Sequence, residues 1–160
     1  MGMLKVVPKH WFSWDFRLQD PVGMPWGEVG LSSWRERGSV TVGGQQYKVS
    51  RQGFVGPFVL EGPNGELAKA VKVSAFKREF TVGVEGHEYR LKQLSSWRRE
   101  FGLFTADARV GAVTPESWLN RRAEVVLPND MPGFARAFVV WLTLLMWKRD
   151  SDAGAVAAGS

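Results

Sequence analysis

Few side chains in this 160-residue sequence have the type and spacing that catalysis or metal binding requires. The chain contains no Cys, which excludes disulfides, thiolate ligands and cysteine nucleophiles. Its two His residues, His10 and His87, have no nucleophile at the spacing of a catalytic motif. The segment 114–118, Thr-Pro-Glu-Ser-Trp, does not match the turn that presents a catalytic serine. We therefore expect a protein that is not an enzyme and that has no cofactor and no metal site.

The side chains that do form a pattern are basic. The sequence has 21 Lys and Arg residues against 16 Asp and Glu, a formal net charge of +5 and an isoelectric point near 9.8. Such an excess favours a negatively charged partner, such as an anionic lipid surface or a nucleic acid. The candidates for binding lipid headgroups are Lys69, Lys72, Lys77 and Arg78, then Arg35 and Arg37, then Arg98 and Arg99. The alternative for all of them is an ordinary solvated rim of mixed charge.

Two of these basic segments share a motif. Residues 31–35 and 94–98 both have the sequence Leu-Ser-Ser-Trp-Arg. A Trp beside a cation is typical of a membrane interface, because the amphipathic ring sits at the level of the headgroups. The alternative is packing at the ends of strands. Glu36, Glu79 and Glu100 interrupt the basic residues, so they form no continuous stripe, and we favour lipid over nucleic acid.

The sequence repeats itself. Residues 13–49 align with residues 55–91 without a gap, at an offset of 55 − 13 = 42 residues. Identical pairs include Phe16 and Phe58, Leu18 and Leu60, Val29 and Val71, Val40 and Val82, and Tyr47 and Tyr89. A fainter third unit has Val113, Trp118 and Val126 in the same phase, with its first strand, Phe101 and Leu103, displaced by one residue. We interpret the chain as three related units.

Each unit predicts about four short strands. Hydrophobic residues alternate with polar ones at period two, as in Phe16 and Leu18, and turns such as Gly43-Gly44 separate the runs. The sequence Asp-Pro-Val-Gly at 20–23 is a further turn, because Pro fixes φ and Gly accepts a positive φ. Three such units give about twelve antiparallel strands. We expect them to close into a barrel, which removes exposed sheet edges.

One helix is predicted, over about residues 131–148, with N-cap candidates at Asn129 and Asp130. From 137 to 147 only Thr143 is polar, and a helix that is apolar on every side must be surrounded on every side. A bilayer is one possible surround. The run is only about 16 Å long against a hydrocarbon core of about 30 Å, so we expect no transmembrane span and place the helix inside the barrel. Its expected core residues are Phe134, Phe138, Val139, Trp141, Leu142, Leu145 and Met146.

The domain organisation follows from these elements. Residues 1–150 are expected to form one domain, and residues 151–160, small and polar, a disordered tail. The first eight residues lack the apolar run of a secretory signal. We therefore expect a cytoplasmic protein that is able to lie at the inner face of the membrane.

This plan resembles the tubby C-terminal-like superfamily. The resemblance covers nearly the whole chain, from Leu4 to about Asp150. It rests on residues 16–20 with Gly23, on 67–72, on 80–82, and on 113–118 leading into the apolar helix. The chain is similar to the smaller bacterial and plant members, the LURP-one-related and scramblase-like proteins. The superfamily implies a closed barrel of repeated hairpins around a hydrophobic helix near the C-terminus.

The resemblance also implies a function without an active site. In tubby itself, Lys and Arg on the outer wall of the barrel bind phosphoinositide headgroups, and the comparable stretch here runs from Lys69 to Arg78. Scramblase-like activity would need a calcium site, for which Asp150 and Asp152 supply only two carboxylates. We expect a binding module for anionic phospholipid or, alternatively, for a protein partner. Scramblase-like activity and nucleic-acid binding are the less favoured alternatives.

Overall fold

In the part of the chain that the structure describes, the fold consists of twelve strands and one helix. The computed structural model describes residues 2–11, 13–32, 35–95, 98–117 and 120–158. The strands are β1 (Gly2–Pro8), β2 (Asp15–Gln19), β3 (Pro25–Leu31), β4 (Gly38–Val42), β5 (Gln45–Arg51), β6 (Phe58–Gly62), β7 (Gly65–Lys72), β8 (Glu79–Val84), β9 (His87–Gln93), β10 (Phe101–Thr105), β11 (Ala108–Pro115) and β12 (Ala123–Leu127), followed by the helix α1 (Gly133–Ala158).

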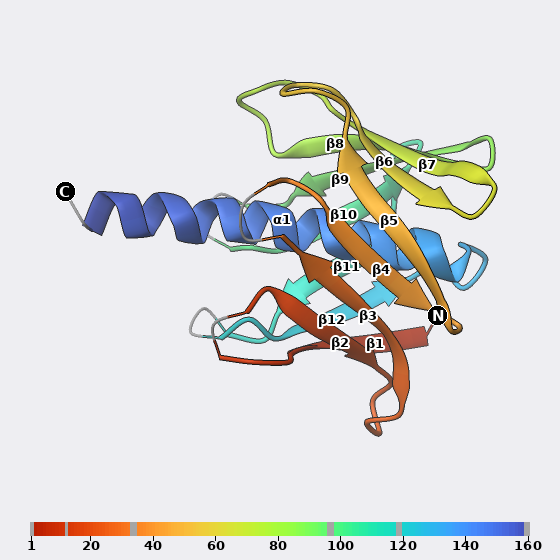
Figure 1. The fold of residues 1–160 in the computed structure, drawn as a ribbon, viewed down its shortest axis with the longest axis horizontal. Coiled ribbons are helices and arrows are strands. Elements are labelled where there is room, and N and C mark those ends of the chain that lie inside the picture. The colour runs from red at the N-terminus through yellow and green to blue at the C-terminus, as the bar shows by residue number, and fades with distance from the viewer. Residues whose placement is uncertain (1, 12, 33–34, 96–97, 118–119, 159–160) are drawn as a thin grey trace.

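The strands close into an antiparallel barrel, as the sequence predicts (Figure 1). Each strand pairs with its neighbours in the chain, and β1 completes the circle by pairing with β12 on one side and β2 on the other. The third unit therefore has only β10, β11 and β12 in sequence, and the N-terminal strand β1 supplies its fourth member. This division explains why the third repeat is difficult to recognise in the sequence.

The three units share a bulge in their first hairpin. The pairing register shifts immediately after Leu18, Leu60 and Leu103, the second inward-facing residue of each first strand. Bulges of this kind increase the local twist and bend the strand, which helps a sheet to close. The repeated bulge indicates that the three units bend the barrel wall in the same way.

The predicted alignment without a gap is wrong within the second strand of each unit. Phe16 lies opposite Val29, whereas Phe58 lies opposite Ala70, so Val29 corresponds to Ala70 and not to Val71. Val29 is buried, whereas the side chain of Val71 is 47% exposed. The reason is that the β2–β3 connection, counted from Leu18 to its partner Gly27, is one residue longer than the β6–β7 connection from Leu60 to Ala68.

The third unit is displaced by one residue throughout, and not only in its first strand. Phe101 lies opposite Val113, and Val113 lies opposite Val125, as Phe58 lies opposite Ala70 and Ala70 opposite Val82. Val126, expected in phase with the first two units, is therefore one residue out of place. Trp118 lies outside the described residues.

The barrel encloses the helix, which confirms the main architectural prediction (Figure 1). The buried helix residues are Ala135, Ala137, Phe138, Val139, Val140, Trp141, Leu142, Thr143, Leu144, Leu145, Met146 and Trp147. Each polar group in this run has a partner. The indole N–H of Trp141 donates to the Gly30 carbonyl at 2.9 Å, that of Trp147 donates to the Arg99 carbonyl at 2.8 Å, and the Thr143 hydroxyl donates to the Val139 carbonyl at 3.0 Å.

Phe134, expected in the core, is only partly buried at the opening of the barrel. Its ring lies 5.6 Å from that of Tyr47.

Asn129 does not cap the helix, because its side-chain oxygen accepts a hydrogen bond from the Gly2 backbone N–H at 2.9 Å. The backbone N–H groups of Ala135 and Arg136 donate instead to the Pro132 carbonyl. Asn129 therefore fixes the start of β1.

The helix is longer at its C-terminal end than the sequence predicts. We expect it to end near residue 148, with a disordered tail from 151, but α1 continues to Ala158. An ion pair between Lys148 and Asp152 at 2.8 Å, one turn apart, spans the expected boundary. Residues 151–154 are exposed, so this part of the helix owes its conformation to local propensity and not to packing.

The approach of α1 to β3 and β4 depends on the glycine at 38. A Cβ atom built there would lie 1.9 Å from the Gly30 carbonyl oxygen and 2.7 Å from the Trp141 indole nitrogen. We expect G38A to lower the free energy of unfolding by about 2–4 kcal/mol, because it separates two paired strands and leaves the indole N–H without its acceptor. Chemical denaturation measures this loss.

A glycine on the outer face of the barrel supplies the control. A Cβ at Gly83 in β8 would meet only the Lys69 carbonyl oxygen, at 4.0 Å. The free energy of unfolding of G83A should therefore lie within about 0.5–1 kcal/mol of that of the natural sequence. Equal losses in the two variants would show that packing against Trp141 does not limit the stability of the barrel.

Candidate functional site

The direction of the helix defines two ends of the barrel. Antiparallel strands place successive loops at alternate ends, so six connections lie where α1 leaves the barrel and six where it enters. We call these the exit end and the entry end. The exit-end loops are residues 9–14, 32–37, 52–57, 73–78, 94–100 and 116–122. The entry-end connections are residues 20–24, 43–44, 63–64, 85–86, 106–107 and 128–132.

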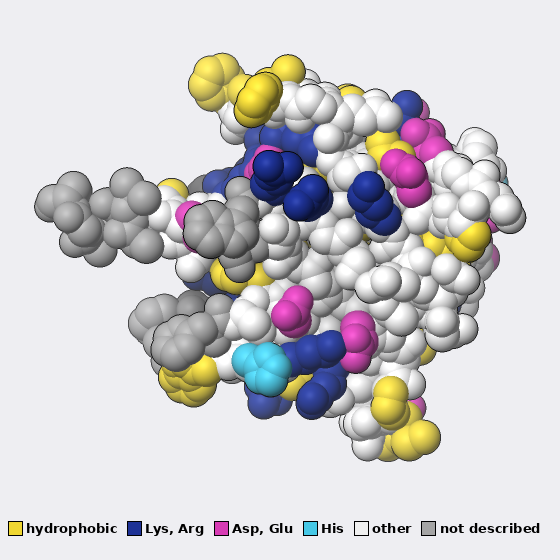
Figure 2. Space-filling model, viewed as in Figure 1, with side chains coloured by type: hydrophobic (Ala, Val, Ile, Leu, Met, Phe, Trp, Pro, Cys, Tyr) yellow, Lys and Arg dark blue, Asp and Glu magenta, His cyan; other side chains and the backbone are white. Residues whose placement is uncertain are grey.

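The two ends carry opposite charge. The charged residues of the exit-end loops, all within the described ranges, are nine cations and three acids: Lys9, Arg35, Arg37, Lys77, Arg78, Arg98, Arg99, Arg121 and Arg122, with Glu36, Glu100 and Glu116. The entry-end connections, which are described in full, contain no Lys or Arg and four acids: Asp20, Glu85, Asp107 and Asp130. Figure 2 shows Lys and Arg side chains close to the point where the helix emerges. The barrel is therefore strongly polarised along the axis of the helix.

Aromatic side chains mark the same end. Trp11, Phe54 and Phe76, each in a different exit-end loop, are 84%, 96% and 98% exposed. Exposed hydrophobic side chains stand out at loop tips on this side in Figure 2. In the sequence, the other three loops contain Trp34, Trp97 and Trp118, which lie outside the described residues. The entry-end connections contain no aromatic residue among their described positions, although Val22 and Met24 are exposed there.

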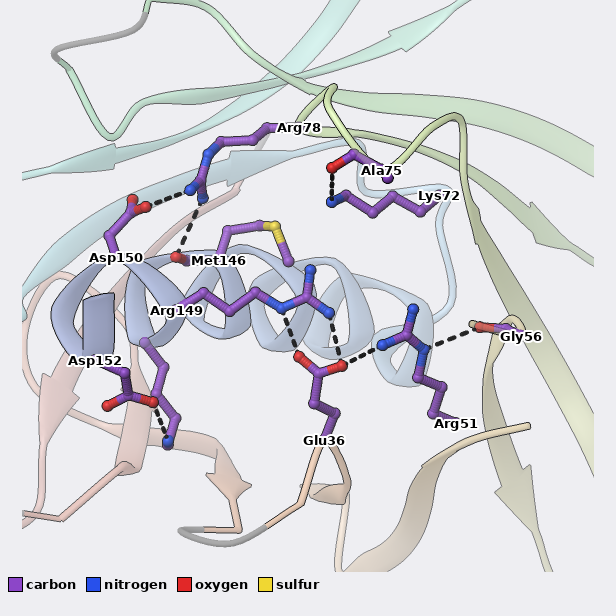
Figure 3. A network of polar contacts seen from close by, with 11 residues as sticks. Glu36, Arg51, Gly56, Lys72, Ala75, Arg78, Met146, Arg149, Asp150 and Asp152 are labelled. Atoms are coloured by element: carbon purple, nitrogen blue, oxygen red, sulfur yellow. Dashed lines mark hydrogen bonds and ion pairs between the residues drawn. The ribbon is translucent and has the colours of Figure 1, made fainter. Parts of the chain in front are cut away.

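A group of charged side chains lies between the helix and the barrel wall at the exit end (Figure 3). We call it the mouth cluster, and its members are Glu36, Arg51, Lys72, Arg78, Arg149 and Asp150. Glu36 joins two of its cations: the guanidinium of Arg149 donates to the Glu36 carboxylate at 2.7 Å, and Arg51 donates to the same carboxylate. The cluster thus ties the β3–β4 loop and β5 to the last buried turn of α1.

The other half of the mouth cluster faces β7. Arg78 forms an ion pair with Asp150, and it also donates to the Met146 carbonyl at 3.3 Å. Lys72 ends β7 and donates to the Ala75 carbonyl at 3.4 Å. Figure 3 shows Lys72 and Arg78 on one side of the helix, and Arg51 with Glu36 towards the other.

The electrostatics of the mouth cluster follow from burial and from the crowding of cations. Burial lowers the pKa of Lys72, the positive charges of Arg149, Arg78 and Arg51 lower it further, and the negative charge of Glu36 opposes them only in part. Burial alone would raise the pKa of Glu36, but its hydrogen bonds and ion pairs with Arg149 and Arg51 outweigh this effect, so the pKa lies below its usual value. Positive charge is in excess at this position.

The structure brings most of the candidate lipid-binding residues to one end. Lys72 lies at the mouth, and the exit-end loops hold Lys77, Arg78, Arg35, Arg37, Arg98 and Arg99. The described residues of both Leu-Ser-Ser-Trp-Arg motifs lie at this end as well. Lys69 does not join them: it lies within β7, 3.8 Å from Glu66, and its neighbours Ala68 and Ala70 are buried. Since side chains alternate along a strand, Lys69 and Lys72 lie on opposite faces.

Sequence reasoning missed two cations of the mouth cluster, Arg51 and Arg149. Both lie close to Lys72 only because β5, β7 and the helix end meet at the exit end. Arg149 shows one local signal, as a basic residue after an apolar helical run, although this favours a helix end and not a binding site.

Arg121 serves the fold. It donates to the backbone carbonyls of Ser13, of His10 at 2.8 Å and of Trp11 at 2.5 Å. Its guanidinium also stacks over the ring of Trp14 at 5.2 Å, and burial lowers its pKa. Arg121 thus holds the first exit-end loop in place and is not an exposed cation.

Comparisons of the chain with models of protein families, with curated proteins and with solved structures found no match. Within the described ranges, the helix is not long and apolar enough to cross a membrane. No group of three or more His, Asp or Glu side chains in the same ranges is placed to hold a metal ion.

The ion pairs of Glu36 predict a pH dependence of stability. A carboxyl group whose pKa is lowered by folding stabilises the folded state above its ordinary pKa, near 4.5, and this contribution is lost as the pH falls below that value. We expect E36Q to lower the free energy of unfolding at pH 7 by about 1–2 kcal/mol and to flatten its fall below pH 4.5. Chemical denaturation at a series of pH values measures both effects.

The exposed Glu88 on β9 offers the matched substitution. E88Q should retain both the stability of the natural sequence at neutral pH and its steep fall in stability below pH 4.5. If the stability of E36Q falls below pH 4.5 as steeply as that of E88Q, the assigned role of Glu36 is contradicted.

Proposed function

We propose that this chain is a non-enzymatic binding module of the tubby C-terminal-like superfamily and that its exit end binds anionic lipid headgroups at a membrane surface. A closed barrel of repeated hairpins around a hydrophobic helix is the plan of that superfamily and supports membership. In this proposal the protein is cytoplasmic and lies peripherally on the inner face of the membrane.

The polarity of the barrel carries the proposal. Each cation close to an anionic leaflet contributes about 1 kcal/mol of attraction, and the effect falls off within a Debye length of about 10 Å. Cations at the exit end therefore attract such a surface, whereas the acidic entry end is repelled by it. This difference favours one orientation, with the helix axis pointing towards the bilayer and the exit-end loops in contact with it.

The aromatic loop tips favour lipid over other polyanions. Phe54 and Phe76 are almost fully exposed beside Arg35 and Lys77, and an interfacial position removes such rings from water while the cations stay at the headgroups. Duplex nucleic acid would satisfy the cations but leave these rings in water. An acidic protein surface with an apolar centre is the second candidate partner, because it would also cover both kinds of side chain.

Reversal of charge at the exit end tests the proposal. The triple variant R35E/K77E/R98E changes exposed loop cations outside the Glu36 ion pairs. We expect its binding to phosphatidylserine vesicles in flotation to weaken by at least about tenfold, since each reversal removes about 1 kcal/mol of attraction and adds repulsion. The natural sequence should also bind less as salt increases and should not bind vesicles of neutral lipid alone.

The control changes the net charge equally elsewhere. R17E/K69E/R109E reverses three cations on the strands β2, β7 and β11, away from the exit-end loops. It should bind within about threefold of the natural sequence, because these positions lie outside the proposed contact. Equal losses in both triple variants would mean that net charge alone governs binding. Binding indifferent to lipid charge would exclude the lipid proposal and favour a protein partner.

The loop tips make a separate prediction. F54S/F76S should weaken vesicle binding by about tenfold, because the apolar rings no longer enter the interface, and should leave the salt dependence of binding unchanged. V22S/M24S, which changes exposed apolar residues at the entry end, is the control and should bind normally. A defect in V22S/M24S as large as that in F54S/F76S would argue against contact through the exit end.

A further inference from the structure

The mouth cluster differs from the cations of the loops because its side chains are partly buried and come from several elements of the fold. Its side chains come from β5, β7, the β3–β4 loop, the β7–β8 loop and α1, and they surround the helix where it leaves the barrel (Figure 3). Arg51 and Arg149 are mostly buried, with Glu36 between them, whereas Arg78 and Asp150 are about one-third exposed. All five side chains therefore keep part of their surface open to solvent, where a small group on an approaching surface can reach them.

The mouth cluster has fewer negative charges than positive ones. Its four cations, Arg51, Lys72, Arg78 and Arg149, face two carboxylates, Glu36 and Asp150, which leaves a formal excess of two positive charges. Both carboxylates are already engaged: Glu36 by Arg51 and Arg149, and Asp150 by Arg78.

Lys72 is the cation of the mouth cluster that forms no ion pair with a carboxylate among the described residues. Within the described residues no carboxylate lies in ion-pair range of its ammonium group, whose hydrogen bond goes to the Ala75 carbonyl at 3.4 Å. Burying a cation among other cations is unfavourable unless an anion joins them. The lowered pKa of Lys72 reflects this environment.

We infer that the mouth cluster is a binding site for a phosphomonoester group. A phosphomonoester carries about −1.5 to −2 charges at neutral pH and three strong acceptor oxygens, which matches both the excess charge and the N–H donors of Lys72, Arg51 and Arg78. A phosphodiester, with one charge, neutralises only half of the excess. The group belongs either to a lipid headgroup, which rests on the proposed function, or to a soluble metabolite, which does not.

This site is distinct from the one that the family resemblance implies. That resemblance points to the outer wall of the barrel, where Lys69 lies, whereas the mouth cluster lies inside the rim and uses the inward-facing Lys72. Lys69 and Lys72 are on the same strand, so K69M is a matched control for K72M. K72R keeps the charge and serves as the conservative variant.

Calorimetric titration of the whole chain with glycerol 3-phosphate tests the site without lipid. We expect binding that is about tenfold or more weaker in K72M, unchanged in K69M and largely retained in K72R. Dimethyl phosphate, a diester, should bind at least about tenfold more weakly than the monoester. Urea denaturation of each variant checks that the fold is retained, and K72R carries the test if K72M does not fold.

Vesicles distinguish the two sources of the phosphate. A preference for phosphatidic acid over phosphatidylserine at equal surface charge, lost in K72M and kept in K69M, would assign the site to a lipid headgroup. Monoester binding in solution without this preference would support the site and assign it to a soluble ligand.

The site and the proposed function fail separately. Absence of monoester binding, equal binding of the diester, or K72M equal to K69M would overturn the site, even if R35E/K77E/R98E still loses vesicle binding. Failure of the natural sequence to bind any anionic vesicle, with monoester binding intact, would overturn the proposed function and support the site.

Discussion

Everything in this structure depends on the burial of a helix that has no polar side. Between residues 137 and 147 the helix must be removed from water all round, and a closed barrel of twelve strands achieves this within one chain. The indole N–H groups of Trp141 and Trp147 find backbone acceptors in the Gly30 and Arg99 carbonyls, so the burial leaves these donors satisfied. Because the helix fills the interior, the charged side chains lie at the two ends of the barrel and on its wall.

Threading the barrel also gives the molecule a direction. Because the strands are antiparallel, the loops divide into two sets, and sequence segments far apart meet at each end. Basic and aromatic side chains gather where the helix leaves, and acids gather where it enters. A molecule polarised in this way meets a charged surface in one orientation, which a barrel with mixed charge at both ends would not do.

The cations of the exit end have different tasks. Arg121 is held by three carbonyl groups and two aromatic rings, and it fixes a loop. Arg51 and Arg149 share Glu36 and fasten the helix end to the wall. Lys72 lies beside them without a carboxylate in ion-pair range among the described residues. The same barrel rim thus contains cations that stabilise the fold and a partly buried cation, Lys72, for which we propose an anionic ligand.

The sequence by itself determined the barrel, its number of strands and the enclosed helix, because period-two alternation and an all-round apolar run are local patterns with few solutions. It did not reveal that β1 completes the third unit, nor that Val29 corresponds to Ala70, because closure and turn length act across the sheet. It singled out most of the cations that lie at the exit end, but not that they lie there together. Only the tertiary structure decided that Arg51, Lys72 and Arg149 lie close together, because the proximity of β5, β7 and the helix end leaves no pattern in linear spacing.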